Sequence, residues 1–100
     1  MLVIHHRRNT INSLKAVNSH LGVEVDIRSF GSKLIINHDP FKESINFEDW
    51  IIHYKHKLLI LNVKEEGLEE PLILLMKKYK INNFFFLDQS FPFLIKTIFI

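Results

Sequence analysis

Four short apolar runs recur along the chain and set its expected architecture. Each is rich in aliphatic or aromatic residues and has the length of a strand buried on both faces, as parallel strands are. Segments with helical spacing lie between the runs, and this alternation is typical of βαβ units and a parallel sheet. The predicted strands are Leu2–His5, Val23–Ile27, Leu58–Val63 and Phe84–Leu87.

The intervening segments predict helices with recognisable ends. Asn9 or Thr10 can cap the first helix and Gly22 can stop it, and Asn46 can cap the second. Lysines gather near the end of the third, where positive charge is favourable. The predicted helices run from the Asn9 or Thr10 cap to about Leu21, over Phe47–His56 and over Gly67–Lys80.

One further run interrupts the strand–helix rhythm. Lys33–Asn37 follows Val23–Ile27 after a turn that contains Gly31 and Ser32. We expect it to return along the second strand as a hairpin excursion.

Composition narrows the class of protein. The chain has 100 residues, 47% hydrophobic and 24% charged, which is the balance of one folded domain. The formal net charge of +2 comes from scattered Lys and Arg without a basic stripe, so we expect no nucleic-acid partner. With no cysteine, a disulfide, a thiolate nucleophile and Cys-ligated zinc are excluded. No apolar stretch approaches the roughly 20 residues of a membrane helix and no signal peptide is recognisable, which favours a cytoplasmic location.

The second predicted strand carries the most informative chemistry. Side chains alternate along a strand, so Glu24, Asp26 and Arg28 share one face. Two carboxylates on a buried face cost several kcal/mol each unless they are compensated, and a hard divalent cation is the usual compensation. The alternative is an edge strand whose acids lie in water and pair with basic residues such as Arg7 or Lys33.

The third predicted strand has the same arrangement. Ile60, Asn62 and Lys64 alternate with apolar residues, so a polar pair enters the same kind of face at the C-terminal end of the strand. Parallel barrels place their sites at that end. The alternative for Lys64 is a solvated strand end.

Histidines stand at two suitable places. His5 and His6 end the first strand and point opposite ways, and His38 follows the extra strand. Two imidazoles beside an acid-lined site suit general acid–base work on a phosphate ester, because their pKa is near neutrality. We expect the remaining histidines to be surface or core residues, although His53 and His56 have a spacing that could share a metal.

These residues occur in an order that resembles a known family. The order is His6-Arg7, Asn9-Thr10, Glu24-x-Asp26, then His38-Asp39-Pro40, and Leu61-Asn62-Val63-Lys64 and Ser90-Phe91 continue it. The pattern is similar to the superfamily of glycerophosphodiester phosphodiesterases and phosphatidylinositol-phospholipase-C-like enzymes, and it covers nearly the whole chain.

The resemblance implies a fold. The family fold is an eight-stranded (β/α) barrel, so residues 1–100 would form its N-terminal half, a parallel, TIM-barrel-like α/β unit truncated to about four βα units.

It also implies a function and a set of roles. The family hydrolyses small phosphodiesters such as glycerophosphodiesters, with a divalent metal, here Mg²⁺ or Ca²⁺. By the resemblance, His6 and His38 act as acid and base, Arg7 and Lys64 contact the substrate phosphate, and Glu24, Asp26 and Asn62 hold the metal.

Two departures keep a second interpretation open. Asn62 stands where the family has a third acid, which lowers metal affinity unless Glu65 or Glu66 reaches in. Half a barrel also leaves strand edges exposed, and the end of the chain, Lys96–Ile100, is strongly apolar. The alternative function is a non-catalytic half-barrel remnant or assembly module, which pairs with a second copy or with a missing C-terminal half.

Overall fold

Seven strands form one mixed sheet, and three short helices accompany it, in the computed structural model, which describes residues 3–37, 44–87 and 98–99. The helices are α1 (Ile11–Lys15), α2 (Phe47–Ile51) and α3 (Glu69–Lys78). The strands are β1 (Val3–His5), β2 (Gly22–Phe30), β3 (Lys33–Ile36), β4 (Ile45–Asn46), β5 (Leu58–Val63), β6 (Phe84–Leu87) and β7 (Ile98–Phe99).

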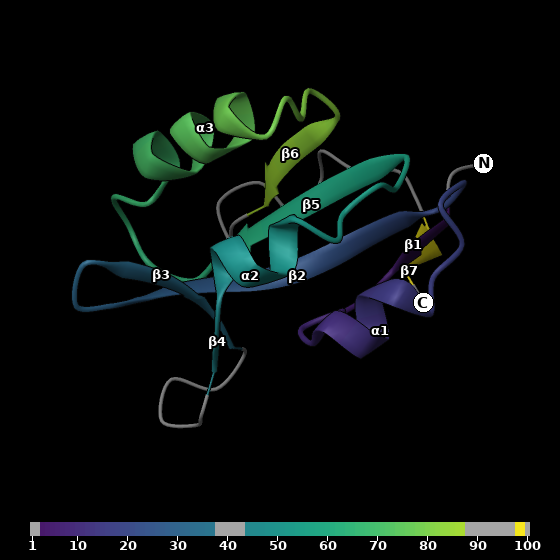
Figure 1. Ribbon diagram of the computed structural model, residues 1–100, viewed down its shortest axis with the longest axis horizontal. Coiled ribbons are helices and arrows are strands. Elements are labelled where there is room, and N and C mark those ends of the chain that lie inside the picture. Colours follow the sequence, from purple (N-terminus) through teal and green to yellow (C-terminus); the bar gives the residue numbers. More distant parts are fainter. Residues whose placement is uncertain (1–2, 38–43, 88–97, 100) are drawn as a thin grey trace.

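The long strand β2 organises the sheet (Figure 1). On one side it pairs in parallel with β5, from Gly22 opposite Leu58 to Ile27 opposite Val63. Its other side is shared, because β1 pairs in parallel with its start and β3 pairs antiparallel with its end. Beyond these, β6 joins β5 and β7 joins β1 in parallel, and β4 joins β3 antiparallel.

A gap between β1 and β3 along the shared side of β2 positions the candidate site. In the gap, the Arg8 N–H donates to the Glu24 carbonyl oxygen at 2.8 Å, and the Asn37 N–H donates to the Asp26 carbonyl oxygen at 3.2 Å. The Asn9 side-chain oxygen accepts from the Asp26 N–H at 3.1 Å. The β1–α1 loop therefore continues the hydrogen bonding of β2 where no strand does so.

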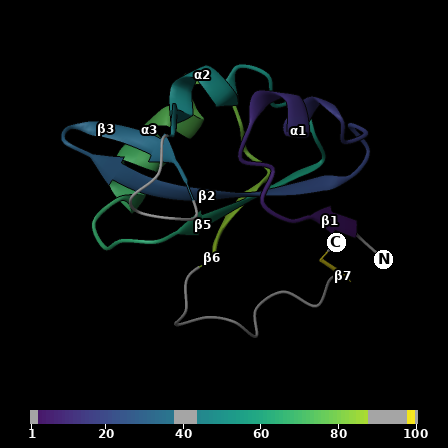
Figure 2. The ribbon, with the colours of Figure 1, turned by 90° about the horizontal axis from the view of Figure 1, so that it is seen from below.

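All three helices lie over one face of the sheet (Figure 2). Their buried side chains, such as Leu14, Trp50 and Leu72, form one cluster with the residues of β2 and β5 that point to that face. Full burial of each large apolar side chain contributes about 1.5–3 kcal/mol, so this cluster is the main source of stability. The sheet residues in the cluster include Val23, Val25, Ile27, Leu59, Leu61 and Val63.

A second, smaller cluster lies on the other face of the sheet. It consists of Ile4, Leu58 and Ile60, with Leu87 packed against it. Gly22 belongs there because an added Cβ would lie 3.0 Å from Ile4 Cγ1 and 3.3 Å from the Leu58 carbonyl oxygen. Glycine thus permits the close approach of β1 and β5 to the start of β2.

The predicted strand positions are confirmed, but the predicted helices are too long. The α1 helix starts at its Thr10 cap, where the hydroxyl accepts from the Ser13 N–H at 3.0 Å, and it ends at Lys15 rather than near Leu21. The α2 helix has the predicted Asn46 cap and ends at Ile51. Tertiary contacts after both helices, described below, override the helical spacing of the sequence.

The fold-class prediction of a parallel, TIM-barrel-like half is wrong. The described strands make a mixed sheet, because β3 pairs antiparallel with β2 and β4 pairs antiparallel with β3. The hairpin predicted as an excursion is an integral part of the sheet, because β3 occupies the side of β2 that β1 leaves open.

Membrane crossing by a helix finds no support in the structure. Among the described residues, no helix combines the length and apolar character that a membrane span requires.

Candidate functional site at a buried carboxylate pair

Glu24 and Asp26 lie side by side on the face of β2 that is turned away from the helices. Their exposed fractions are 2% and 0%, so both carboxylates are removed from water. The alternative of an edge strand with solvated acids is wrong, since β2 is paired on both sides. Burial on this scale is unfavourable for two negative charges unless hydrogen bonds and cations surround them.

The Glu24 carboxylate is held by the residues that end β1. His6 Nδ1 lies 2.9 Å from Glu24 Oε1, and the Arg7 N–H donates to the same oxygen at 3.3 Å. An ionised Glu24 carboxylate can only accept, so it matches the His6 tautomer that carries its proton on Nδ1. The His6 side chain is 44% exposed.

Arg7 has a backbone conformation that L-residues rarely adopt. Its φ is +50°, in the left-handed region, and this turn is what directs its N–H at Glu24. Such conformations cost free energy and gather at functional sites. Arg7 itself is exposed, and it contacts the carboxylate pair through its backbone N–H.

Strand β5 contributes the remaining predicted residues of this face. Asn62 lies opposite Asp26 in the register and donates from Nδ2 to Glu24 Oε2 at 3.3 Å. Lys64, the residue that follows β5, places Nζ 3.5 Å from Asp26 Oδ1. The structure thus brings together His6, Arg7, Glu24, Asp26, Asn62 and Lys64, the six predicted site residues that it describes.

Asn9 is a site residue that the sequence analysis missed, apart from its place in the family pattern. Its Nδ2 donates to Asp26 Oδ2 at 2.9 Å while its Oδ1 accepts from the Asp26 N–H at 3.1 Å. One side chain therefore fixes both the backbone and the carboxylate of Asp26. The only available signal was an asparagine in the loop after β1, and the gap in the sheet that it fills is not visible in the sequence.

The loop that carries these residues is anchored to the helix layer. The fully buried Trp50 donates from Nε1 to the Arg8 carbonyl oxygen at 2.7 Å. Arg8 Nη2 in turn donates to His5 Nδ1 at 3.0 Å. These contacts assign different roles to the two adjacent histidines, because His5 contacts Arg8 and His6 contacts Glu24.

Other predicted participants lie elsewhere. His38 is outside the described residues, as is the Ser90-Phe91 pair; Asn37, the residue before His38, is bonded to the Asp26 backbone. Glu65 does not reach the carboxylate pair, because its two oxygens accept from the Ser29 N–H at 2.9 Å and the Ser29 hydroxyl at 2.6 Å.

His56 is a structural residue, and the shared metal considered for His53 and His56 finds no support. His56 is 5% exposed and both ring nitrogens are used. The Lys55 N–H donates to Nδ1 at 3.3 Å, so Nε2 carries the proton and donates to the Val17 carbonyl oxygen at 2.8 Å. A ring bonded at both nitrogens has no lone pair left for a metal.

The carboxylate pair suits a hard divalent cation in part. Two buried carboxylates supply the oxygen ligands and the negative charge that Mg²⁺ and Ca²⁺ prefer. Against this, Asn62 turns its nitrogen toward Glu24, so its amide would have to rotate to present oxygen. Over the described ranges, no group of three or more His, Cys, Asp or Glu residues is gathered to hold a metal ion.

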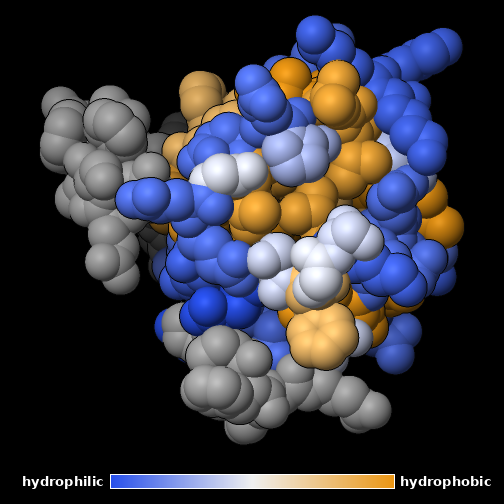
Figure 3. Space-filling model, turned by 90° about the vertical axis from the view of Figure 1, so that its left-hand side faces the viewer, coloured by the Kyte–Doolittle hydropathy of each residue, from blue (hydrophilic) through white to orange (hydrophobic). Residues whose placement is uncertain are grey.

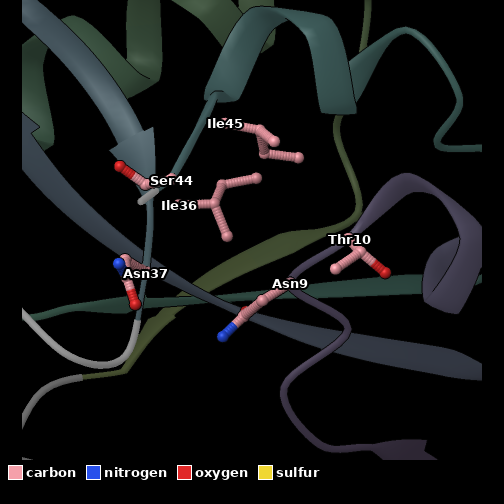
Figure 4. Close-up of a pocket in the computed structure, with 6 residues that line it drawn as sticks. All are labelled: Asn9, Thr10, Ile36, Asn37, Ser44 and Ile45. Carbon is pink, nitrogen blue, oxygen red and sulfur yellow. The ribbon is translucent and has the colours of Figure 1, made fainter. Parts of the chain in front are cut away.

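Two hollows are lined in part by residues of β3 or its flanking loops. One, of about 520 Å³, borders the site at Asn9, and its described lining residues are uncharged and come from the β1–α1 loop, the end of β3 and the start of β4 (Figure 4). Another, of about 350 Å³, lies between β3 and α3 on the face shown in Figure 3, where apolar side chains are surrounded by hydrophilic ones. The first hollow is lined by Asn9, Thr10, Ile36, Asn37, Ser44 and Ile45.

Comparisons with known proteins add no relative. No protein-family model, no curated protein and no solved structure matches the chain. The family resemblance therefore stays a prediction that depends on the residues quoted for it.

Proposed function

We propose that the carboxylate pair of β2 is the centre of a phosphodiester-hydrolysing site that works with a divalent cation, Mg²⁺ or Ca²⁺. The observation that carries the proposal is the burial of Glu24 and Asp26 side by side, with an imidazole 2.9 Å from the first. A structural role alone gives little reason to keep two buried acids together, because a buried charge network is often no more stable than apolar packing.

His6 is the residue that moves a proton in this proposal. Glu24 holds Nδ1 and fixes the tautomer, so Nε2 is the atom that accepts a proton from an attacking hydroxyl or returns one to the leaving oxygen. The negative charge of Glu24 also stabilises the imidazolium that forms. His38 is the second acid–base residue expected from the resemblance.

The remaining residues bind and orient. Arg7, an exposed residue whose backbone N–H bonds Glu24, would supply a guanidinium that matches a phosphate group, and Lys64 offsets the charge of Asp26. Glu24, Asp26 and a rotated Asn62 would hold the cation, which supplies polarisation of the phosphoryl group. The described lining of the neighbouring hollow offers hydroxyl and amide groups, which suit the uncharged part of a glycerophosphodiester-type substrate.

Binding of a divalent cation at the carboxylate pair is tested by thermal melting of the protein in the presence of Mg²⁺, Ca²⁺ or Mn²⁺. A ligand that binds only the folded chain raises its melting temperature. We expect a saturable rise for the wild type, and none for Asp26→Asn, which keeps the size of the side chain. The matched control is Asp49→Asn, an exposed residue of α2, which should keep the rise.

A melting temperature that does not respond to any of the three cations would remove the metal from the proposal. The second candidate function, a non-catalytic module that assembles with a second copy of the chain, would then be the better supported one. Its supporting observation is Phe85, which is 57% exposed on β6, an apolar strand without a charge. A dimer mass by light scattering, reduced to that of the monomer by Phe85→Lys, is its expected result.

A further inference from the structure

A cationic hollow lies on the helix side of the sheet, away from the carboxylate pair. It has a volume of about 420 Å³ and is formed by the end of α1 and the segment after α2. Its described charged and titratable lining consists of Lys15, His53, Tyr54 and Lys55 together with the buried His56, and no Asp or Glu is among its described lining residues. Two lysines from different elements therefore line the hollow, and no carboxylate is among its described lining residues.

The wall behind the lysines is fixed by hydrogen bonds. His56 links the segment after α2 to the chain beyond α1 through its 2.8 Å bond to the Val17 carbonyl oxygen. Tyr54 packs its ring against the His56 ring, with 5.6 Å between centroids. The backbone that carries Lys55 is thus set by a buried contact rather than by loop geometry alone.

The other side of this segment is also held. Asn83 Nδ2 donates to the carbonyl oxygens of His56 at 2.8 Å and Lys57 at 2.6 Å. The Lys57 N–H donates to the Leu21 carbonyl oxygen at 3.1 Å. A segment bonded on both sides loses little freedom when a ligand binds, and this preorganisation favours affinity.

We propose that this hollow binds a phosphate group, carried by a small soluble molecule or by a lipid headgroup. Lys15 and Lys55 supply ammonium donors from opposite elements, and charge-assisted hydrogen bonds to phosphate are the strong ones. Ile52, 61% exposed, lines the same hollow and offers an apolar contact to the group that bears the phosphate. The site is independent of the hydrolytic site proposed above.

Inorganic phosphate, titrated into the whole chain and followed by calorimetry and by ¹H–¹⁵N NMR, tests the proposal. We expect saturable binding with the largest shifts at Lys15 and at residues 53–57. The double variant Lys15→Ala/Lys55→Ala should bind at least about tenfold more weakly, since each lysine loses a charged hydrogen bond. The control Lys33→Ala/Lys77→Ala removes the same charge from exposed positions elsewhere and should bind as the wild type does.

Vesicles of phosphatidylcholine, with and without phosphatidic acid, separate the two sources of phosphate. Sedimentation with the acidic vesicles, lost in Lys15→Ala/Lys55→Ala, assigns the site to a lipid headgroup. Phosphate binding without sedimentation assigns it to a soluble compound. The proposal is overturned if neither probe binds, if the control variant weakens binding equally, or if the NMR shifts lie at Arg7 and His6 instead.

Discussion

At the scale of single residues, the candidate site depends on side chains that replace strand pairing. Asn9 bonds both the backbone and the carboxylate of Asp26, in the gap that β1 and β3 leave along β2. The Glu24 carboxylate is held by the His6 ring and by the backbone N–H of Arg7, whose φ is in the left-handed region. A buried acid held in this way has a fixed position before any ligand arrives, which is a requirement for a binding or catalytic site.

Replacement of Asn9 tests this view. Asn9→Ala leaves the buried Asp26 without two hydrogen bonds, and we expect the free energy of unfolding to fall by about 1–3 kcal/mol. Urea denaturation measures the change. Asn12→Ala, at an exposed position of α1, is the matched control and should change stability by less than about 0.5 kcal/mol. Equal effects of the two variants would mean that Asn9 does not support Asp26.

Much of this site could be predicted from the sequence, because side-chain alternation is a local property. The period of two placed Glu24 and Asp26 on one face, and it placed Asn62 of β5 and Lys64 just after β5 on the same side of the sheet. The role of Asn9 could not be predicted in the same way, since it depends on where two other strands end along β2.

At the scale of elements, a carboxylate ties the far end of β2 to the loop after β5. Both Glu65 oxygens accept hydrogen bonds from Ser29. Oε2 accepts from the Ser29 hydroxyl, and Oε1 accepts from the Ser29 backbone N–H. These bonds lower the pKa of Glu65 below its ordinary value of 4.5. The folded chain therefore binds this proton less readily than the unfolded chain does.

The sign of the pH dependence follows from that lowered pKa. The contribution of Glu65 to stability is fully present above the ordinary pKa and is lost as the pH falls through the folded-state pKa. Urea denaturation of the wild type and of Glu65→Gln should show a stability difference that shrinks as the medium is acidified below the ordinary pKa. Glu66→Gln, at the exposed neighbouring position, should show no such trend. A difference that persists in acid would contradict the assigned hydrogen bonds.

The helices show the limit of periodic patterns. Their positions and two of their caps follow from the sequence, but α1 and α2 are each a single short segment of 5 residues. The helix ends at Ile51, and His56, five residues later, is buried in the core and bonds the Val17 carbonyl oxygen. The sequence alone predicted that His56 belongs to the helix, because its spacing is helical. Its hydrogen-bond partner lies on another element and could not be predicted from that spacing.

At the scale of the whole molecule, strand positions were predictable and sheet topology was not. Apolar runs mark β1, β2, β5 and β6 locally, whereas the direction of β3 and β4 and the layer chosen by the helices are long-range properties. The inference from βα alternation to a parallel barrel failed at that step. Fold does not determine function. The failure of the barrel prediction therefore does not decide whether the carboxylate face is catalytic, and its chemistry has to be tested directly.

Hydrolysis of bis(p-nitrophenyl) phosphate in the presence of Mg²⁺ or Ca²⁺ tests the central claim most directly. The wild type should release p-nitrophenol in a cation-dependent manner, and His6→Asn should slow this by about 10²–10⁴-fold, as expected for loss of a general acid–base group. The adjacent His5→Asn is the matched control, because His5 contacts Arg8 rather than Glu24, and it should retain most of the activity. No hydrolysis by the wild type, or an equal loss in both variants, would contradict the account.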